Sequence, residues 1–337
     1  MSPVAGPLRV LAGRIAAQAA ALGWRGAFDL AGLTDRSGDL PLGAPGRLSP
    51  NGSCRLVPAA DGWLAVNLPR MDDLDLVPAW LDGASADGLG EAVARRPWRD
   101  LVAGARELGL PVAGVGEIAA ADMAAPFLSV GRAGPGPQGR VRVLDLSTLW
   151  AGPLCGAVLA AFGADVTKLE STRRPDPSRM ATPDFFHRLN RAKADLSLDF
   201  ADPEGRARLR ETMLAADVVI TSARSRAFEQ MELSPASLFA ERPDLVWVAI
   251  SGYGWSGEAA DRVAFGDDAA AAGGLVRWSS GGEPGFLGDA LADPLTGLSA
   301  AAGALEALAQ GGGVIVDAAL AHTAAGAAAE LGLAGAG

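Results

Sequence analysis

Short apolar runs alternate with helical segments in the second half of the chain. The run Val141–Leu146 is apolar and β-rich, small and apolar residues fill Leu154–Phe162, and a second β-rich run follows at Val166–Leu169. Strand, turn, helix and strand within about thirty residues form a βαβ unit. A crossover this short, with a nearly all-apolar helix, is typical of a buried parallel sheet. The breakers in Trp150–Pro153 predict a turn at the carboxyl end of the first strand, where open α/β sheets bind ligands.

The same alternation continues to the end of the chain. Apolar runs predict further strands at Ala194–Asp199, Val218–Thr221, Leu245–Ser251 and Val314–Asp317. Helical patterns occur at Asp202–Ala215, Ala223–Gln230, Ser234–Ala240, Asp267–Leu275, Asp293–Leu308 and Ala318–Leu331. Polar or glycine-rich stretches predict loops at Ser171–Pro183, Gly252–Ala264 and Arg277–Ala290. About five or six strands alternating with helices predict the α/β class with a parallel sheet as its core.

The first part of the chain has a different pattern. Leu8–Leu22 has helical periodicity, and residues 26–53 predict a long loop or linker. Residues 55–118 predict a compact α+β unit, made of a hairpin at Cys54–Leu68, helices at Asp72–Leu81, Gly88–Ala94 and Pro97–Leu108, and a strand at Val112–Val115. Ala119–Gln138 then runs through proline and glycine, so we expect a domain boundary near 130–140. The predicted domains are residues 1–130, with the helix, linker and small α+β unit, and residues 140–337.

Composition and charge narrow the function classes. The 337 residues are 49% hydrophobic and 20% charged, which is enough for two domains with substantial cores. A formal net charge of −10 argues against nucleic acid as a partner. No segment of the sequence has the pattern of a membrane span, so we expect no membrane partner.

The cysteines indicate no special chemistry. Cys54 and Cys155 are far apart and have no metal-ligand spacing, so both are expected to be buried thiols. Because no signal peptide is recognisable, the reducing cytoplasm is the expected location. The sequence also contains no Ser-His-Asp series and no P-loop, and the turn after the first strand lacks the G-x-G-x-x-G of a dinucleotide site. The hypothesis that the protein is a dinucleotide-dependent oxidoreductase therefore rests only on the strand–turn–helix pattern.

Five segments of the second half together resemble the family III CoA-transferases, which include formyl-CoA transferase, carnitine-CoA transferase and α-methylacyl-CoA racemase. The segments are VRVLDLSTLWAGPLCGAVLAAFGADVTKLE, LNRAKADLSLDFADPEGRARL, ADVVITSAR, PDLVWVAISGYGWSG and LADPLTGLSAAAGALEAL. They follow the family's order and spacing over roughly residues 140–320. The resemblance implies a Rossmann-like CoA-binding domain in an α/β fold, with a smaller α+β domain placed N-terminal to it.

The order of the segments departs from the family. DGWLAVNLP and ELGLPVAGVGEI resemble the family's small domain, which here comes first. APFLSVGRAGPGPQG resembles the family's tail and runs straight into the segment that resembles its N-terminus. The simplest interpretation is a circular permutation or a similar rearrangement, which proteins tolerate where their termini lie close together. Residues 26–53 contain no convincing counterpart of the family's glycine-rich active-site loop.

The resemblance implies a nucleophile. Family transferases use an Asp carboxylate that attacks the acyl-CoA carbonyl, and the matching residue here is Asp293, shortly before Thr296 and Gly297. The alternative is that Asp293, followed by Pro294, is only the N-cap of the helix. Asp289 and Glu283 are expected to be loop carboxylates.

The racemase branch of the family pairs this Asp with a His. The chain has only His187 and His322, and Phe265 occupies the corresponding position, so racemase activity is disfavoured. Asp267 and Asp268, which follow in the same segment, are expected to be structural.

The resemblance also implies residues that bind CoA or substrate. Clustered arginine side chains suit the phosphate groups of CoA, although any one of these arginines could instead be solvated surface charge. Trp150 could shape the acyl pocket or pack on the small domain, and the functional and structural interpretations of Tyr253 stay equally open. The full set of expected binding residues is Trp150, Ala151, Gly152, Arg174, Arg179, Asn190, Lys193, Arg224 and Tyr253.

Three function hypotheses remain. The first is a CoA-transferase that moves CoA between an acyl-CoA and a carboxylic acid, with CoA as substrate, no tightly bound cofactor and a homodimeric assembly, as the resemblance implies. The second is a diverged homologue that binds CoA or an acyl-CoA without transfer, motivated by Ser222, Ala223 and Gln230, which replace residues that the family usually keeps. A related acyl-CoA reaction, such as isomerisation or dehydration, is an alternative to transfer within the first hypothesis. The third hypothesis is the dinucleotide-dependent oxidoreductase.

Overall fold

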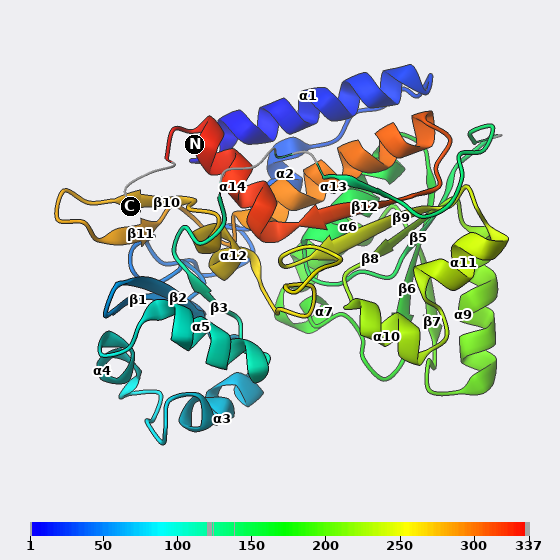
Figure 1. Ribbon diagram of the computed structural model, residues 1–337. Helices are drawn as coiled ribbons and strands as arrows, with labels where there is room; N and C mark the ends of the chain where they lie inside the picture. Colours follow the sequence, from blue (N-terminus) through cyan, green and yellow to red (C-terminus); the bar gives the residue numbers. More distant parts are fainter. Residues whose placement is uncertain (1, 120–122, 124, 138, 334–337) are drawn as a thin grey trace.

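A seven-stranded sheet forms the centre of the computed structural model, which describes residues 2–119, 123, 125–137 and 139–333 (Figure 1). The strand order is β4-β12-β9-β8-β5-β6-β7, and every neighbouring pair is parallel except β4 with β12. The strands are β4 Phe127–Ser129, β5 Arg142–Asp145, β6 Asp165–Ser171, β7 Ala194–Leu198, β8 Val218–Thr221, β9 Val246–Ser251 and β12 Val314–Ala319. The predicted α/β class with a largely parallel sheet is confirmed.

The strand order reverses in the middle of the sheet. From β5 the chain adds β6 and β7 on one side, and then β8, β9 and β12 on the other. The connections that leave β5 and β8 therefore run to opposite faces of the sheet, which opens a crevice at their carboxyl ends.

Alternating side chains along the strands bury both faces of the sheet. Val218 and Val248 pack toward α6 and α13, while Val219 and Trp247 pack toward α9, α10 and α11. Helix α1 lies across α13 as an outer layer (Figure 1). The helices over the two faces are α1 Ala5–Ala21, α6 Ala151–Ala161, α9 Pro203–Ala215, α10 Ser225–Gln230, α11 Pro235–Glu241 and α13 Ala292–Ala309.

A smaller antiparallel sheet with the order β1-β2-β3 precedes the large sheet in the chain. One of its faces packs on its own helices, and the other packs on α12 and on the hairpin of β10 and β11. The predicted hairpin and the helices around it are confirmed. The elements are β1 Cys54–Ala59, β2 Gly62–Asn67, β3 Val112–Gly114, α3 Met71–Trp80, α4 Leu89–Ala94, α5 Trp98–Glu107, α12 Gly266–Ala272, β10 Val276–Trp278 and β11 Pro284–Phe286.

Several expectations about secondary structure are wrong. The predicted break Ala151-Gly152-Pro153 is instead the first turn of α6, where a proline costs no helical hydrogen bond. The predicted loop Arg277–Ala290 contains most of the hairpin β10–β11. The stretch Ala119–Gln138 contains the edge strand β4, while Gln138 itself lies outside the described residues. Two predicted loops also contain a short helix each: α2 Leu30–Thr34 lies within residues 26–53, and α7 Ser178–Ala181 lies within Ser171–Pro183. The remaining helices are α8 Pro183–Asn190 and α14 Leu320–Glu330.

Two kinds of feature are absent from the described part of the chain. None of its helices has the length and apolar character needed to cross a membrane. The described residues also contain no group of His, Cys, Asp and Glu side chains arranged to hold a metal ion.

Candidate active site

A cavity of about 480 Å³ opens at the carboxyl edge of the large sheet. Its walls come from the segments that follow β5, β6, β8, β9 and β12, together with Arg70 from the small sheet's side and Asp293 from α13. The cavity thus lies at the reversal of strand order between β5 and β8, which is where sheets of this kind bind ligands.

The cavity wall is strongly basic. Five guanidinium groups line it, but Asp293 is the one carboxylate among its described lining residues. Incomplete solvation and the neighbouring charge of Arg226 lower the pKa of Arg224. Like charges gathered in this way favour an anionic ligand with several phosphate or carboxylate groups. The five arginines are Arg70, Arg174, Arg224, Arg226 and Arg262.

Two of these arginines are held in place by acidic and aromatic neighbours. Arg262 donates to Glu117 at 2.5 Å and stacks 3.6 Å from the centre of the Tyr253 ring. Arg70 pairs with Asp73 at the start of α3 and lies near the Phe265 ring. Both guanidinium groups are therefore pre-oriented at the cavity.

Asp293 is the second residue of α13, and its carboxylate is packed against the backbone of Gly266. Burial raises the pKa of Asp293 from 3.8 to about 7, with Arg36 acting to lower it and Asp267 and Asp289 acting to raise it further. The start of a helix favours a negative charge, but burial outweighs that effect here.

The N-cap interpretation of Asp293 is wrong. The N-cap of α13 is Leu291, and no side chain caps the helix. The carboxylate instead faces the backbone N–H of Ala151 at the start of α6. Asp293 is therefore a buried carboxylate at the wall of a basic cavity.

A cluster of polar side chains lies behind Asp293. Arg36 donates to both oxygens of Asp289, at 2.6 and 3.1 Å. Asn51 donates to Asp267 at 2.6 Å and to Asp289 at 2.7 Å. The backbone N–H of Ala290 donates to Asp267 at 2.7 Å. Burial raises the pKa of Asp267 to about 6, so the ionisation of this one carboxylate is suppressed.

Buried charges fix the turn that precedes α6. Lys193 pairs with Asp145 at 2.7 Å. Burial acts to raise the pKa of Asp145, but Lys193 and Lys168 lower it to about 2. Asp176 accepts from the backbone N–H of Leu149 at 3.0 Å, and Leu149 has a φ of +68°, in the left-handed region. These contacts hold the turn, and with it the start of α6, in one conformation at the cavity.

Four of the expected site residues line the cavity together. They are Ala151, Arg174, Arg224 and Asp293. Trp150 does not line the cavity: its indole N–H donates to the carbonyl of Leu33 at 3.0 Å, in α2 and not in the small α+β unit.

Five further expected site residues lie outside the cavity lining. Lys193 also donates to the side chain of Asn190 at 2.8 Å, beneath the turn. Gly152 packs so closely against Ser147 that a Cβ at position 152 would clash with the Ser147 side chain. Arg179 pairs with Glu170 and Asp195, and Tyr253 is buried beneath Arg262. Their side chains are engaged within the protein.

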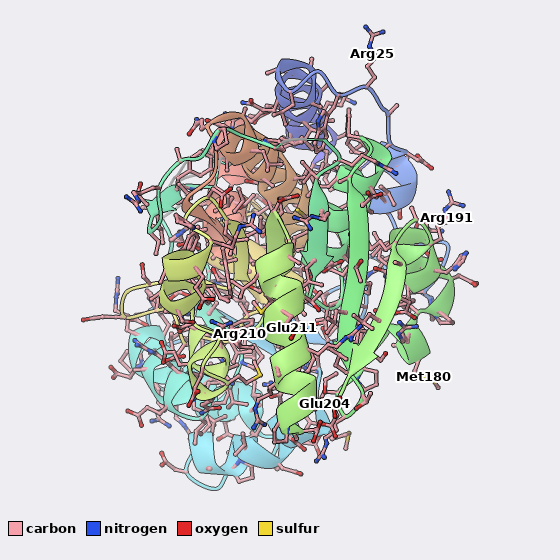
Figure 2. All side chains as sticks on the ribbon, turned by 90° about the vertical axis from the view of Figure 1, so that its right-hand side faces the viewer. Arg25, Met180, Arg191, Glu204, Arg210 and Glu211 are labelled. Atoms are coloured by element: carbon pink, nitrogen blue, oxygen red, sulfur yellow. The ribbon has the colours of Figure 1, made fainter. Side chains whose placement is uncertain are left out.

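Sequence analysis did not single out several residues that the fold brings to this region. Arg70, Arg262, Arg36 and Asn51 are distant in sequence from Asp293, and no local pattern marks them. Arg191, at the end of α8, projects into solvent (Figure 2).

The sequence profile of CoA-transferase family III matches residues 139–333, which is more than half of the chain. The chain belongs to CoA-transferase family III. This confirms the expected family, and the matched range contains all the predicted site residues. Arg36, Asn51 and Arg70 lie before it.

Curated members of the family are similar over part of their length. A succinyl-CoA–D-citramalate CoA-transferase from Chloroflexus aurantiacus is 34% identical over 196 residues, which cover 54% of this chain and 49% of that protein. A succinate–glutarate CoA-transferase from Agrobacterium fabrum is 30% identical over 203 residues, which cover 55% and 51%. The chain spans about half the length of these relatives.

A solved structure of a CaiB/BaiF family protein from Brucella suis is also similar. It has a TM-score of 0.52 and 30% identity, over 59% of this chain and 56% of that one. The large, mostly parallel sheet of this chain is consistent with that similarity.

Proposed function

We propose that the protein transfers CoA between an acyl-CoA thioester and a carboxylic acid, with Asp293 as the nucleophile. The observation that carries this proposal is the position of Asp293: it is the one carboxylate on the described wall of a cavity lined by five arginines. Membership of CoA-transferase family III and the names of the curated relatives support the same reaction class.

The arginines suit the phosphate groups of CoA. Arg224 and Arg226 follow β8 at the reversal of strand order, and Arg174 follows β6. Guanidinium groups bind phosphate oxygens through paired hydrogen bonds. We therefore assign the nucleotide end of CoA to this part of a Rossmann-like CoA-binding domain, with the thioester end toward Asp293.

The proposed first half-reaction uses only the Asp293 carboxylate. Its oxygen attacks the thioester carbonyl carbon, and the carbon–sulfur bond breaks with its electron pair moving to sulfur. The products are a mixed anhydride and CoA thiolate. The thiolate then attacks the side-chain carbonyl of Asp293 and expels the donor's carboxylate, which leaves an enzyme–CoA thioester.

The second half-reaction is the reverse with a new acid. The acceptor carboxylate attacks the enzyme thioester and releases CoA thiolate, which then attacks the acceptor's carbonyl carbon in the new anhydride. The new acyl-CoA leaves and the Asp293 carboxylate is restored. No net proton is taken up, so the sequence needs an ionised Asp293 but no separate general base.

A transfer assay tests the proposal. The wild type and Asp293→Asn are incubated with a panel of acyl-CoA donors and carboxylic acids, and new acyl-CoA is detected by mass spectrometry. We expect transfer by the wild type and a loss of about 10³-fold or more in the variant. Calorimetry with CoA is the control, because both proteins should bind it with an affinity that falls as salt rises.

Two results would count against this function. Full transfer by Asp293→Asn would remove that residue from the mechanism. A wild type that binds CoA but transfers it between no donor and acceptor would favour the alternative, a family member that binds CoA without transfer.

A further inference from the structure

The positive charge of Arg36 acts on Asp293, although Arg36 precedes the residues 139–333 that match the family. Arg36 lies in the segment after α2, and its side chain is only 19% exposed. It donates to both oxygens of Asp289, whose side chain is 8% exposed. Its guanidinium also lies 4.8 Å from the centre of the Trp150 ring. The paired hydrogen bonds and the stacking together fix the position of this charge.

The charges around Asp293 are unbalanced. Asp267 from α12 and Asp289 from the loop after β11 both act on it, and Arg36 is the cation that opposes them. Asp268 and the buried thiol of Cys54 lie one layer behind, next to Asp267. On the open side of Asp293 are the five arginines that line the cavity, Arg70, Arg174, Arg224, Arg226 and Arg262.

The neutral groups of the cluster reinforce this arrangement. Asn51 bridges Asp267 and Asp289, and it comes from the same segment of the chain as Arg36. The carboxylate of Asp293 is packed against Gly266, next to Asp267. Arg36 and Asn51 therefore hold these carboxylates from one segment of the chain, and neither residue lines the cavity.

We propose that Arg36 is a positioning residue for the transfer reaction: its fixed charge keeps the buried Asp293 carboxylate ionised and able to attack. The proposal rests on the function proposed above. A buried carboxylate close to two others loses its charge unless a cation offsets the desolvation and the repulsion. Arg36 supplies that cation without entering the cavity where the substrate would bind.

Arg188 provides a matched control. It too joins this segment of the chain to the rest of the protein, through an ion pair with Asp39. Its guanidinium lies 5.1 Å from the centre of the Phe185 ring, and that ring packs edge-on against Trp150. Arg188 is not among the main influences on the pKa of Asp293. Replacing it loosens the same segment but leaves the charge next to Asp293 in place.

The experiment compares pH–rate profiles of transfer for Arg36→Gln, Arg36→Lys, Arg188→Gln and the wild type. The wild-type rate should rise with pH as Asp293 ionises. In Arg36→Gln we expect the midpoint to move up by about one unit, so that transfer is about tenfold slower on the acid limb and recovers at high pH. Arg36→Lys keeps the charge but not the paired hydrogen bonds, so its midpoint should lie between those of Arg36→Gln and the wild type. Arg188→Gln should leave the midpoint unchanged.

Infrared pH titration of the free protein provides a readout that does not depend on activity. The carboxylic-acid band of Asp293, identified by its loss in Asp293→Asn, should titrate at higher pH in Arg36→Gln than in the wild type. If no transfer occurs at all, the proposed function fails but this titration still decides the role of Arg36. An unchanged titration midpoint in Arg36→Gln, or an equal shift in Arg188→Gln, would overturn the proposal.

Discussion

At the residue scale, the side chains of Asp268 and Asn67 form a buried pair in which the protonation state of the carboxyl group matters. Asn67 donates to Oδ1 of Asp268 at 2.7 Å, and the backbone N–H of Phe265 donates to the same oxygen at 2.9 Å. Among the described residues, Oδ2 of Asp268 and Oδ1 of Asn67 have no hydrogen-bond partner. Protonation of Asp268 at Oδ2 removes the cost of burying an unpaired negative charge there. Burial raises the pKa of Asp268 from 3.8 to about 7, in agreement with such a neutral acid.

Asp268→Asn should therefore stabilise the protein at pH 8. The raised pKa means that unfolding releases a proton from Asp268 between pH 3.8 and about 7. The wild type consequently loses stability as pH rises through that window. An asparagine amide can take the same hydrogen bonds and cannot ionise, so that this loss disappears.

Thermal unfolding at several pH values measures this effect. We expect Tm of Asp268→Asn to exceed that of the wild type by about 2 °C or more at pH 8, and the difference to vanish near pH 4. A variant that is less stable than the wild type at pH 8 would show that the folded protein does not raise the pKa of Asp268.

Sequence patterns located only part of the candidate site. Asp293 could be predicted because Thr296 and Gly297 follow it in a recognisable local motif. Arg36 and Arg70 could not, since their approach to the site depends on how distant segments pack. Lys193 was expected among the binding residues, but nothing in its local sequence indicates the buried carboxylate of Asp145 with which it pairs.

At the element scale, hydrophobic periodicity predicted the long helices and the buried strands well. The failures are short elements whose pairing depends on a distant strand, such as β4 beside β12. The start of α6 was also missed, because a glycine and a proline act as breakers in a helix interior but not in its first turn.

The crossing of α13 and α6 requires a glycine. A Cβ at position 297 would lie 2.6 Å from the carbonyl oxygen of Ala151 and 2.8 Å from a methyl group of Leu154. Gly297→Ala should therefore force the two helices apart, at a cost of about 1–3 kcal/mol in the free energy of unfolding. Because Asp293 and Ala151 meet at this crossing, transfer should fall as well.

Gly13→Ala on α1 is the matched control, because a Cβ there meets no atom within 4 Å. Alanine is the better helix former, so this variant should be more stable than the wild type by about 0.5–1 kcal/mol. Denaturant unfolding of both variants checks the pair. Equal stability of Gly297→Ala and the wild type would contradict the close crossing.

At the scale of the whole molecule, the two parts of the chain contribute to one site. The large sheet and α13 belong to the range that matches the family, whereas Arg36, Asn51 and Arg70 precede it. The predicted division into residues 1–130 and 140–337 and the rearranged order of the segments stay predictions. The homodimer also stays a prediction. Light scattering would test it, because a dimer has twice the 34.1 kDa mass of one chain.

The central claim is that an acyl group and then CoA become covalently attached to Asp293. The most direct measurement is trapping: the protein is incubated with acyl-CoA thioesters, treated with hydroxylamine or borohydride, and digested for peptide mass spectrometry. We expect modification at Asp293 that depends on acyl-CoA and is absent from Asp293→Asn. Transfer activity accompanied by modification at another carboxylate, such as Asp289 or Glu283, and none at Asp293 would contradict the account.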